Sequence, residues 1–453
     1  MRLSNLLVTI VIVFITLASF LRLSWVESFI FALSLGLFFQ GALASFSMLY
    51  SFLRPESLQK VLPPRVVYGG GYYKYSLIVP ARNEEKVIGD TIKAMAKINY
   101  PKDLYEVLVV IRKDDQETLT AAKKAMDELN VDSVLSKADI KIIKINGDTI
   151  SKPHSLNMSL NYATGQVIAV FDAEDEPHKD ILKSVDDVFL KKKVDIVQAG
   201  VQLINVSSRW FSALNCLEYY YWFKSILPFM SNLGSTPLGG NTVFFRKDVL
   251  QALGGWDESC LTEDADVGIR ASVAGYKTAM VYVEDMATLE ETPQDEWAFI
   301  KQRTRWDQGY LQILLKGNFL KLPTLRQQFL SLYLLTQPII HQFTVIAMIF
   351  IPILSWGLKV PLWLAMFSWF PFYFLLVQFG LYIIGLMDLK KHYSLSFSNS
   401  LFFYLPVFFI PYQLMLAFSF FRAVLRMFLG VFNWEKTYHA NTHRLASKPV
   451  LNK

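Results

Sequence analysis

Hydrophobic residues are concentrated at the two ends of the chain and leave a middle part with an alternating pattern. Segments 6–25 and 28–53 are almost continuously apolar, and each is long enough to cross a bilayer as a helix. The first could be a signal peptide, but no small-residue cleavage site follows it and a second apolar segment begins at once. We therefore predict two transmembrane helices within residues 1–55, followed by a connector at 56–71.

The middle of the chain, residues 72–325, has the pattern of a soluble α/β domain. Short runs rich in valine and isoleucine alternate there with amphipathic stretches such as 117–129. Buried parallel strands have such continuous apolar runs, and the amphipathic stretches fit crossover helices. We expect a parallel sheet, with additional interfacial helices beside the membrane near 210–233 and 294–316.

Long apolar segments return over residues 326–429. Segments 327–355 and 360–387 each qualify as a transmembrane helix. The last apolar stretch, 396–428, is different because it carries two prolines in its middle. It has thirty-odd residues, which is short for two full crossings of a bilayer.

Cationic residues beside the apolar segments predict an orientation. Lys390 and Lys391 precede the stretch 396–428, and Arg422 and Arg426 stand near its end. The positive-inside rule places both groups on the cytoplasmic side. We therefore expect this stretch to form a re-entrant or tilted hairpin that bends near Pro411. The same rule, applied to the cations after the second apolar segment, places the middle domain in the cytoplasm.

The composition supports a membrane protein and argues against other classes. Of the 453 residues, 53% are hydrophobic and only 19% are charged, whereas a soluble protein carries about 25% charged residues. The net charge of +6 is too small to indicate a nucleic-acid partner, and it suits a protein beside anionic lipid. The two cysteines suggest neither a disulfide framework nor a metal site.

Polar residues follow the predicted strands, at the ends where parallel α/β sheets bind ligands. After the first strand these residues are Pro80, Ala81, Arg82, Asn83 and Glu84. An ordinary strand-to-helix cap explains this set equally well. After the second strand, Asp114 and Asp115 could hold a ribose or a base edge, or belong to a solvated loop.

An acidic turn follows the apolar strand predicted at 166–171. Asp172, Glu174 and Asp175 stand within four positions, where their charges repel one another unless a cation lies among them. Oxygen ligands without histidine or cysteine point to Mg²⁺ or Mn²⁺. Lys152, on the approach to this strand, could offset a phosphate charge. An exposed acidic turn is the alternative.

Two further clusters lie at predicted helices. Thr262 is a natural helix N-cap, so Glu263 and Asp264 would stand in the first turn, where the helix dipole favours an ionised carboxylate. Acids at such positions commonly serve stability alone. The other cluster comprises Gln302, Arg303, Arg305 and Trp306. Its arginines could clamp a diphosphate while the tryptophan stacks on a sugar, or the helix could anchor at the membrane surface.

Taken in order, these clusters resemble the motifs of membrane-integrated family 2 glycosyltransferases, the group of cellulose, hyaluronan and chitin synthases. The resemblance covers nearly the whole chain. It implies an α/β, Rossmann-like GT-A catalytic domain inserted between N- and C-terminal transmembrane helices. In that family a strand-end aspartate, here Asp114 or Asp115, and a DxD motif, here residues 172–174, bind the nucleotide sugar and its metal. A TED motif supplies the base, here Asp264, and a QxxRW motif, here 302–306, holds the diphosphate and the acceptor.

The sequence departs from the family pattern at three places. The usual Asp-Asp-Gly-Ser turn is replaced by residues 113–117, so the identity of the contacting aspartate stays open. The metal motif is Asp-Ala-Glu, with Asp175 as a spare ligand. In the cytoplasmic tail 430–453, residues 434–439 replace the gating-loop motif of cellulose synthases and look like a loop that closes over the nucleotide. Its candidate binding residues are Lys436, Thr437 and His439. A basic tail bound to lipid headgroups is the alternative.

The resemblance implies an inverting, metal-dependent glycosyltransferase at the cell membrane. We expect a nucleotide-diphosphate sugar, in particular a UDP-sugar, as donor and a growing polysaccharide as acceptor. One alternative is a single transfer to a lipid, such as a polyprenyl phosphate or a glycolipid. Another is a non-catalytic membrane transporter or scaffold. Membrane lipids are expected partners, and nucleic acid is not.

Overall fold

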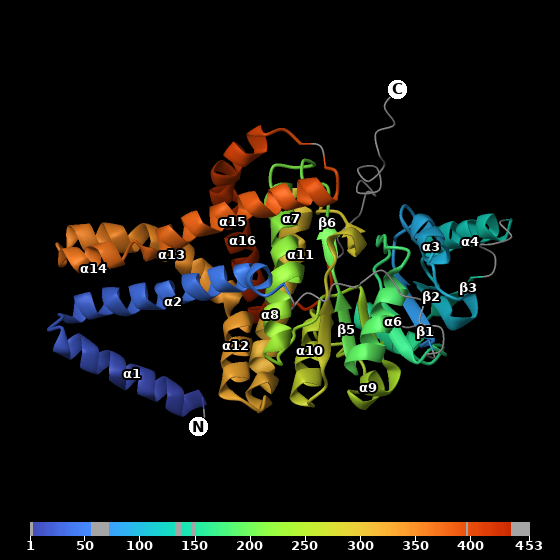
Figure 1. Cartoon of the computed structure of the whole chain (residues 1–453), viewed down its shortest axis with the longest axis horizontal. Coiled ribbons are helices and arrows are strands. Elements are labelled where there is room, and N and C mark those ends of the chain that lie inside the picture. The colour runs from blue at the N-terminus through green and yellow to red at the C-terminus, as the bar shows by residue number, and fades with distance from the viewer. Residues whose placement is uncertain (1–2, 56–71, 132–137, 147–150, 396, 436–453) are drawn as a thin grey trace.

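The computed structural model describes residues 3–55, 72–131, 138–146, 151–395 and 397–435. Figure 1 shows an α/β domain at one end of the molecule and long helices that extend away from it at the other. The strands are β1 (Tyr75–Ala81), β2 (Tyr105–Arg112), β3 (Asp139–Ile145), β4 (Val167–Val170), β5 (Ile196–Ala199), β6 (Val201–Leu203), β7 (Val243–Arg246), β8 (Thr278–Val281) and β9 (Thr288–Glu290).

The helices fall into two groups along the chain. Those of the middle part are α3 (Ile88–Ala96), α4 (Gln116–Asn130), α5 (Lys152–Ser159), α6 (Ile181–Lys192), α7 (Ser212–Tyr221), α8 (Leu227–Asn232), α9 (Lys247–Ala252), α10 (Glu263–Val273) and α11 (Glu296–Lys316). Those at the two ends are α1 (Leu3–Phe20), α2 (Trp25–Leu53), α12 (Leu325–Leu335), α13 (Gln337–Gly357), α14 (Leu362–Phe367), α15 (Phe370–His392) and α16 (Ser400–Phe428).

The main sheet has seven strands in the order β3-β2-β1-β4-β7-β5-β8. Strand β7 runs antiparallel to both of its neighbours, and the other pairings are parallel. The sheet is therefore mixed, whereas the apolar runs predict a purely parallel one. The apolar run of a buried strand does not encode its direction, which explains this difference.

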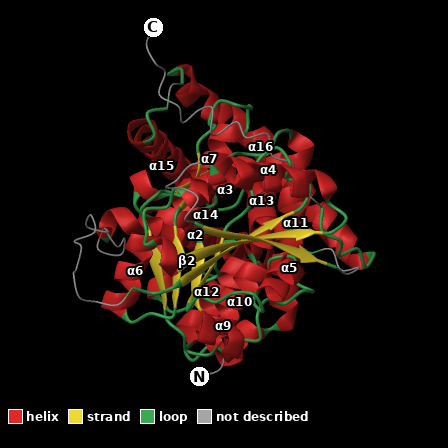
Figure 2. Cartoon of the chain, turned by 90° about the vertical axis from the view of Figure 1, so that its right-hand side faces the viewer, coloured by secondary structure: helices red, strands yellow, loops and turns green. Residues whose placement is uncertain are grey.

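Helices cover both faces of the sheet, as Figure 2 shows. Side chains alternate between the faces: Leu77 and Val79 lie in one core cluster with residues of α3, α4 and α6. Ile78 lies in a second cluster with residues of α5, α9 and α10. Because both faces are buried, each inner strand needs apolar residues at every position, which accounts for its continuous hydrophobic run.

A buried carboxylate joins the inner strands near their amino ends. Glu106 of β2 is only 1% exposed and accepts hydrogen bonds from Ser76 Oγ (2.7 Å) and from Thr164 N (2.6 Å) and Oγ1 (2.8 Å). Lys141 Nζ of β3 lies 2.9 Å from its other oxygen. Burial opposes ionisation, but hydrogen bonds from Ser76, Lys141 and Thr164 lower the pKa of Glu106 to about 2.

Within the described residues, four apolar stretches of helix are long enough to cross a membrane, and the chain is a multi-pass membrane protein. They are α2, α13, the α14–α15 stretch Leu362–His392, and α16. Helix α2 begins with a capping box of Ser24 and Glu27 and packs against α13 and α15. The described apolar part of α1, Val8–Phe20, is shorter than the other four.

The structure corrects two expectations for the C-terminal part. The segment 327–355 is not one helix, because α12 ends before Thr336 and α13 begins after it. The hairpin expected at 396–428 is wrong, because α16 is one continuous helix through Pro406 and Pro411. Prolines are tolerated within apolar helices when neighbouring helices satisfy the freed backbone groups, and α16 packs along α11 and α13.

Helix α16 runs in a different direction from the other long helices, and the cationic ends of α15 and α16 both contact the middle part of the chain. In Figure 1, α2, α13 and α15 extend along the molecule, whereas α16 runs across them beside α11. At the end of α15, His392 lies 3.4 Å from Asp285 of the α/β domain. At the end of α16, Arg426 donates to Gln308 of α11 (2.9 Å). Both cationic ends therefore contact the same part of the molecule.

Replacing Glu106 with glutamine tests the carboxylate that joins β1, β2 and β3. At pH 7 we expect Glu106→Gln to lower the free energy of unfolding by about 3 kcal/mol, because ionised Glu106 is stabilised in the folded chain. Its folded pKa is depressed, so this contribution is complete above the ordinary pKa of 4.5 and is lost as the pH falls toward about 2. Denaturant unfolding in detergent measures the difference.

The matched control is Glu117→Gln, which changes an exposed carboxylate on α4. It should leave stability within about 0.5 kcal/mol of the wild type. Equal stability of the two variants across the pH range would contradict the role assigned to Glu106.

Candidate active site

A cavity of about 530 Å³ opens at the carboxyl edge of the sheet. Residues that follow β1, β2 and β4 line one end of it, together with the turn that precedes β7. Its other end reaches Met48 of α2, residues 337–342 of α13, Tyr382 of α15 and Leu416 of α16. One cavity therefore connects the sheet edge with the long apolar helices.

Most of the residues predicted from the sequence line this cavity. They are Pro80, Ala81, Arg82, Glu84, Lys152, Asp172, Glu174, Glu263, Asp264, Gln302, Arg303, Arg305 and Trp306. They come from segments that are far apart in the chain and meet because the fold brings the strand ends, α5, α10 and α11 together.

Lys152 stands between the two acidic clusters. At the start of α5, its ammonium group forms an ion pair with Asp172 and donates to the carbonyl of Gly240 (2.8 Å). A Cβ atom at Gly240 would lie 3.1 Å from Asp264 Oδ2 and 3.7 Å from Lys152 Nζ, so these groups share one small space. Burial opposes the charge, but Asp172, Glu263 and Asp264 raise the pKa of Lys152.

Glu263, Asp264 and Glu290 of the cavity have raised pKa values. Burial, followed by the charge of Asp264, raises the pKa of Glu263 to about 7. Burial also raises the pKa of Asp264 itself. On the other side, burial and the charges of Glu174 and Asp172 raise the pKa of Glu290 to about 8. Several acidic groups close together at a buried position are typical of functional sites, and their mutual repulsion favours the binding of a cation.

The first turn of α10 is held against α11. Thr262 occupies the N-cap position as predicted, but its side chain makes no capping hydrogen bond, and α10 ends at Val273 with Gly275 at φ +85°. A Cβ at Gly309 of α11 would overlap the Thr262 side chain, so only glycine permits this close approach. The contact fixes the position of Asp264 relative to the predicted diphosphate-binding helix.

The two arginines of α11 have different surroundings. Arg305 lies with its guanidinium carbon 5.5 Å from the centre of the Trp434 ring, and Arg82 lies 5.9 Å from the same ring. Arg305 Nε has no hydrogen-bond partner among the described residues. Arg303 instead forms an ion pair with Glu218. Arg305 is therefore the cation of this helix that is available to a ligand at the sheet edge.

Of the predicted residues that the structure describes, four do not line the cavity: Asn83, Asp114, Asp115 and Asp175. Asn83 has a left-handed φ of +52°, and its backbone N–H donates to Asp115 Oδ2 (2.5 Å). Asp115 also caps α4 by accepting from Thr118 N (3.2 Å), so it fixes the turn rather than facing the cavity. Asp114 is exposed and pairs with Arg112, whose guanidinium lies 2.9 Å away and does line the cavity.

Asp175 is fully buried beneath the acidic turn. It accepts a hydrogen bond from the backbone N–H of Asp172 (2.8 Å) and another from Asn241 Nδ2 (2.9 Å). Its carboxylate thus supports the turn from behind, as the sequence pattern could not show. Lys436, Thr437 and His439 lie outside the described residues.

Asp172 and Glu174 fit a divalent cation. Both side chains line the cavity, and their charges raise the pKa of neighbouring Glu290. Mg²⁺ and Mn²⁺ prefer oxygen ligands, and Mg²⁺ commonly takes only one or two protein carboxylates and completes its shell with phosphate and water oxygens. Two carboxylates beside an open cavity match that donor set.

The sequence analysis missed several polar residues of the cavity. Glu290 ends the short strand β9 and Glu291 follows it, so the strand-end argument applied to the other clusters would also have found them. Glu218 and His341 come from α7 and α13. Their role depends on packing between distant helices, so no local signal identifies them.

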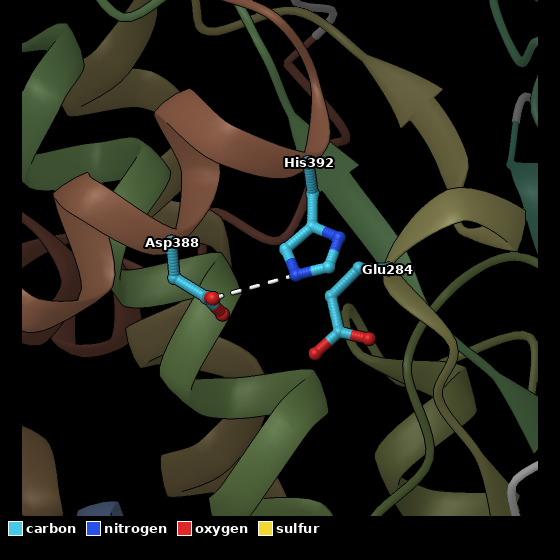
Figure 3. A group of neighbouring side chains, drawn as sticks. All are labelled: Glu284, Asp388 and His392. Carbon is cyan, nitrogen blue, oxygen red and sulfur yellow. Dashed lines mark ion pairs between the residues drawn. The ribbon is translucent and has the colours of Figure 1, made fainter.

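A second group of titratable side chains joins α15 to the α/β domain. Figure 3 shows Glu284, Asp388 and His392 close to one another, as a metal site would require. The ammonium of Lys224, only 8% exposed, lies 2.7 Å from Glu284 and 2.6 Å from Asp388. The ammonium group of Lys224 thus occupies the position that a metal ion would need, and these residues form an ion-pair network between α15 and the α/β domain.

Comparison with known proteins identifies similar chains. Residues 73–309 match the family model described as glycosyltransferase like family 2. The chain is 29% identical over 269 residues to beta-monoglucosyldiacylglycerol synthase of Nostoc sp., which covers 58% of this chain and 53% of that protein. It is 26% identical over 393 residues to the probable glycosyltransferase YdaM of Bacillus subtilis, which covers 82% of this chain and 88% of that protein.

A plant protein and a solved structure extend this comparison. Glucomannan 4-beta-mannosyltransferase 7 of Arabidopsis thaliana is 25% identical over 276 residues, or 58% of this chain and 48% of that protein. The chain thus spans about half the length of the Nostoc and Arabidopsis relatives. The mannosyltransferase PcManGT from Pyrobaculum calidifontis, solved with GDP-Man and Mn²⁺, superposes with a TM-score of 0.55 at 17% identity, over 88% of this chain and 99% of that one. This likeness shows a shared GT-A fold.

Manganese binding tests the role of Asp172 and Glu174. In the presence of a nucleoside diphosphate, we expect Asp172→Asn and Glu174→Gln each to raise the dissociation constant of Mn²⁺ at least tenfold, on the order of 1.4 kcal/mol. Electron paramagnetic resonance of free Mn²⁺ in a titration measures this constant. Asp127→Asn, an exposed carboxylate of α4, is the matched control and should bind Mn²⁺ like the wild type. Unchanged affinity in both test variants would place the metal elsewhere.

Proposed function

The chain belongs to glycosyltransferase family 2, and we propose that it transfers a sugar from a nucleotide-diphosphate sugar to a hydroxyl group held at the membrane. The reaction is inverting and uses a divalent cation, with a UDP-sugar as the expected donor. The catalytic domain faces the cytoplasm, where nucleotide sugars are available. The orientation rests on the cations that follow the second apolar segment, and the donor class and the stereochemistry rest on the resemblance of the site motifs to the family.

One observation carries this proposal. The cavity that contains Asp264, Asp172 and Glu174 is also lined by helices α2, α13 and α15, which are long and apolar enough to cross a membrane. A donor bound at the sheet edge and an acceptor held among these helices would therefore meet inside one space. A non-catalytic scaffold or transporter has no need for this convergence of acids and cations.

Asp264 is the proposed general base. Its carboxylate lies in the first turn of α10 beside Lys152, and burial raises its pKa, which makes it a better proton acceptor near neutral pH. It removes the proton from the acceptor hydroxyl as the oxygen attacks the anomeric carbon. The bond between that carbon and the diphosphate oxygen breaks in the same step, so the configuration inverts.

The departing diphosphate gains negative charge and needs cations. Arg305 has an unpaired Nε and a position beside Trp434, which suit binding of a phosphate oxygen. Lys152 supplies a second positive charge between the acidic clusters. A divalent ion bound by Asp172 and Glu174 would neutralise charge on the diphosphate. Trp306 offers a ring on which a sugar can stack.

The cavity favours a lipid acceptor over an extruded polysaccharide. Along α13 this cavity reaches only residues 337–342, the first turns of the helix, and does not follow it further. A processive synthase remains the second candidate, because the similar Arabidopsis protein is a glucomannan mannosyltransferase.

Product analysis tests the proposed function. Purified protein in lipid vesicles is incubated with a panel of radiolabelled nucleotide sugars and Mg²⁺ or Mn²⁺. We expect one donor to yield a lipid that carries a single added sugar. A ladder of lengthening sugars would support the polysaccharide synthase instead, and no transfer from any donor would refute both.

Asp264→Asn tests the assignment of the base. Because general-base catalysis is worth about 10²–10⁴-fold in rate, we expect kcat to fall about 10³-fold. The KM for the donor should change less than about threefold, since the carboxylate acts on the acceptor. Initial rates of nucleotide release measure both constants, and Asp127→Asn serves as the control. A loss of less than tenfold would assign the base to another residue.

A further inference from the structure

The end of the cavity beside the apolar helices has its own group of polar side chains. They are Glu218 of α7, Arg303 and Asp307 of α11, and His341 and Gln342 of α13. None of the predicted donor contacts at the sheet edge requires Glu218, Asp307 or Gln342. Their chemistry therefore bears on whatever molecule enters from the membrane side.

Asp307 has no fixed partner within the described part of the chain. Its carboxylate faces the cavity, and it makes no hydrogen bond or ion pair with a described residue. Arg303 and Glu218 are the charged groups close enough to influence it electrostatically. Asp307 is half-buried at the wall of the cavity, and a ligand hydroxyl group there would supply the hydrogen-bond partner that the described part of the protein does not.

The cation of this end is already neutralised. Arg303 forms an ion pair with Glu218 and donates to Asn215 Oδ1 (2.7 Å). Its guanidinium carbon also lies 4.8 Å from the ring centre of Phe299 and 4.5 Å from that of Trp306. The charge of Arg303 is thus balanced by Glu218, although its Nε atom has no hydrogen-bond partner among the described residues.

Two amides provide further capacity for hydrogen bonds. Gln342 is 6% exposed and lines the cavity, and its side chain makes no hydrogen bond with the described residues. The Oε1 atom of Gln302 is likewise buried without a partner. An amide and a carboxylate aimed into one cavity suit hydroxyl groups, which both donate and accept.

This group is connected with the proposed base. Arg303, Asp307 and Tyr310 stand at positions i, i+4 and i+7 of α11, on one face of the helix. Tyr310 is close enough to both Asp264 and Asp307 for their charges, after burial, to raise the pKa of its hydroxyl. A headgroup bound at Asp307 could therefore present a hydroxyl to Asp264.

We propose that Glu218, Asp307 and Gln342 form an acceptor subsite that binds an uncharged, hydroxyl-bearing headgroup and disfavours anionic acceptors such as a polyprenyl phosphate. This inference rests on the proposed function, because it defines the acceptor of the same transfer. Asp307 and Gln342 hydrogen-bond to hydroxyl groups of the headgroup, while Glu218 balances the charge of Arg303 and so leaves no net positive charge to attract a phosphate. Sites built to bind hydroxyl groups discriminate strongly against ligands that lack them.

Acceptor selectivity provides the test. The full-length protein in phosphatidylcholine vesicles is given its donor and either a monohexosyl diacylglycerol or a polyprenyl phosphate. We expect kcat/KM to be at least tenfold higher for the neutral lipid. Asp307→Asn and Glu218→Gln should each raise the KM for the neutral lipid about tenfold, while the KM for the donor changes less than threefold. Glu296→Gln, on the same helix but outside the cavity, is the matched control.

The outcomes separate this inference from the proposed function. Equal use of both lipids, or an Asp307→Asn variant with the acceptor KM of the wild type, overturns the subsite. The Glu218→Gln substitution removes the ion pair with Arg303, so it could change the packing of the protein as well as acceptor binding. The Asp307→Asn substitution removes no described hydrogen bond or ion pair, so its effect on the acceptor KM reports on the subsite itself. Absence of nucleotide release from every donor by the wild type overturns the proposed function itself, and the subsite with it.

Discussion

The burial of several carboxylates around one ammonium group is the constraint on which the rest of the structure depends. Lys152 contacts Asp172 directly and lies close to Asp264, and these two acids belong to clusters almost a hundred residues apart. Without the lysine, the acids would repel one another in a cavity that is only partly open to water, where screening is weaker than in bulk solvent. The sheet edge, α5 and α10 are therefore held together by charge as well as by apolar packing. A bound divalent cation and a bound diphosphate would add one positive and one negative group to this arrangement of opposite charges.

The long apolar helices form the remaining wall of the cavity that contains these charged groups. Helix α11 carries Arg305, which lies beside Trp434, and Asp307, which lies close to Glu218 of α7, so residues of this one helix line two parts of the cavity. Helix α16 lies along α11 and ties to it through Arg426 and Gln308. The network around Lys224 joins α15 to the domain at another point. A lipid entering between these helices would thus meet a site whose position relative to the donor is fixed.

Local sequence signals predicted the parts of this molecule that depend on local chemistry. Apolar runs identified the strands. The acidic turn after a strand identified Asp172 and Glu174, and the predicted helix start identified Asp264; all three line the cavity. The direction of β7 and the course of α16 depend on which elements pack together, which periodicity does not encode. Asp175 was predicted as a metal ligand for its proximity in sequence, yet it lies behind the turn. Asp307 and Glu218 form a group only because α7, α11 and α13 meet.

The stereochemistry of the transfer tests the central claim most directly, namely that Asp264 activates an acceptor hydroxyl for a single displacement inside one cavity. The measurement is the anomeric configuration of the newly formed bond, determined by proton NMR of the product made from an α-linked nucleotide sugar. The account predicts a β-linked product, because the acceptor oxygen attacks opposite the departing diphosphate. An α-linked product would require two displacements or another mechanism and would contradict the roles assigned to Asp264 and its neighbours.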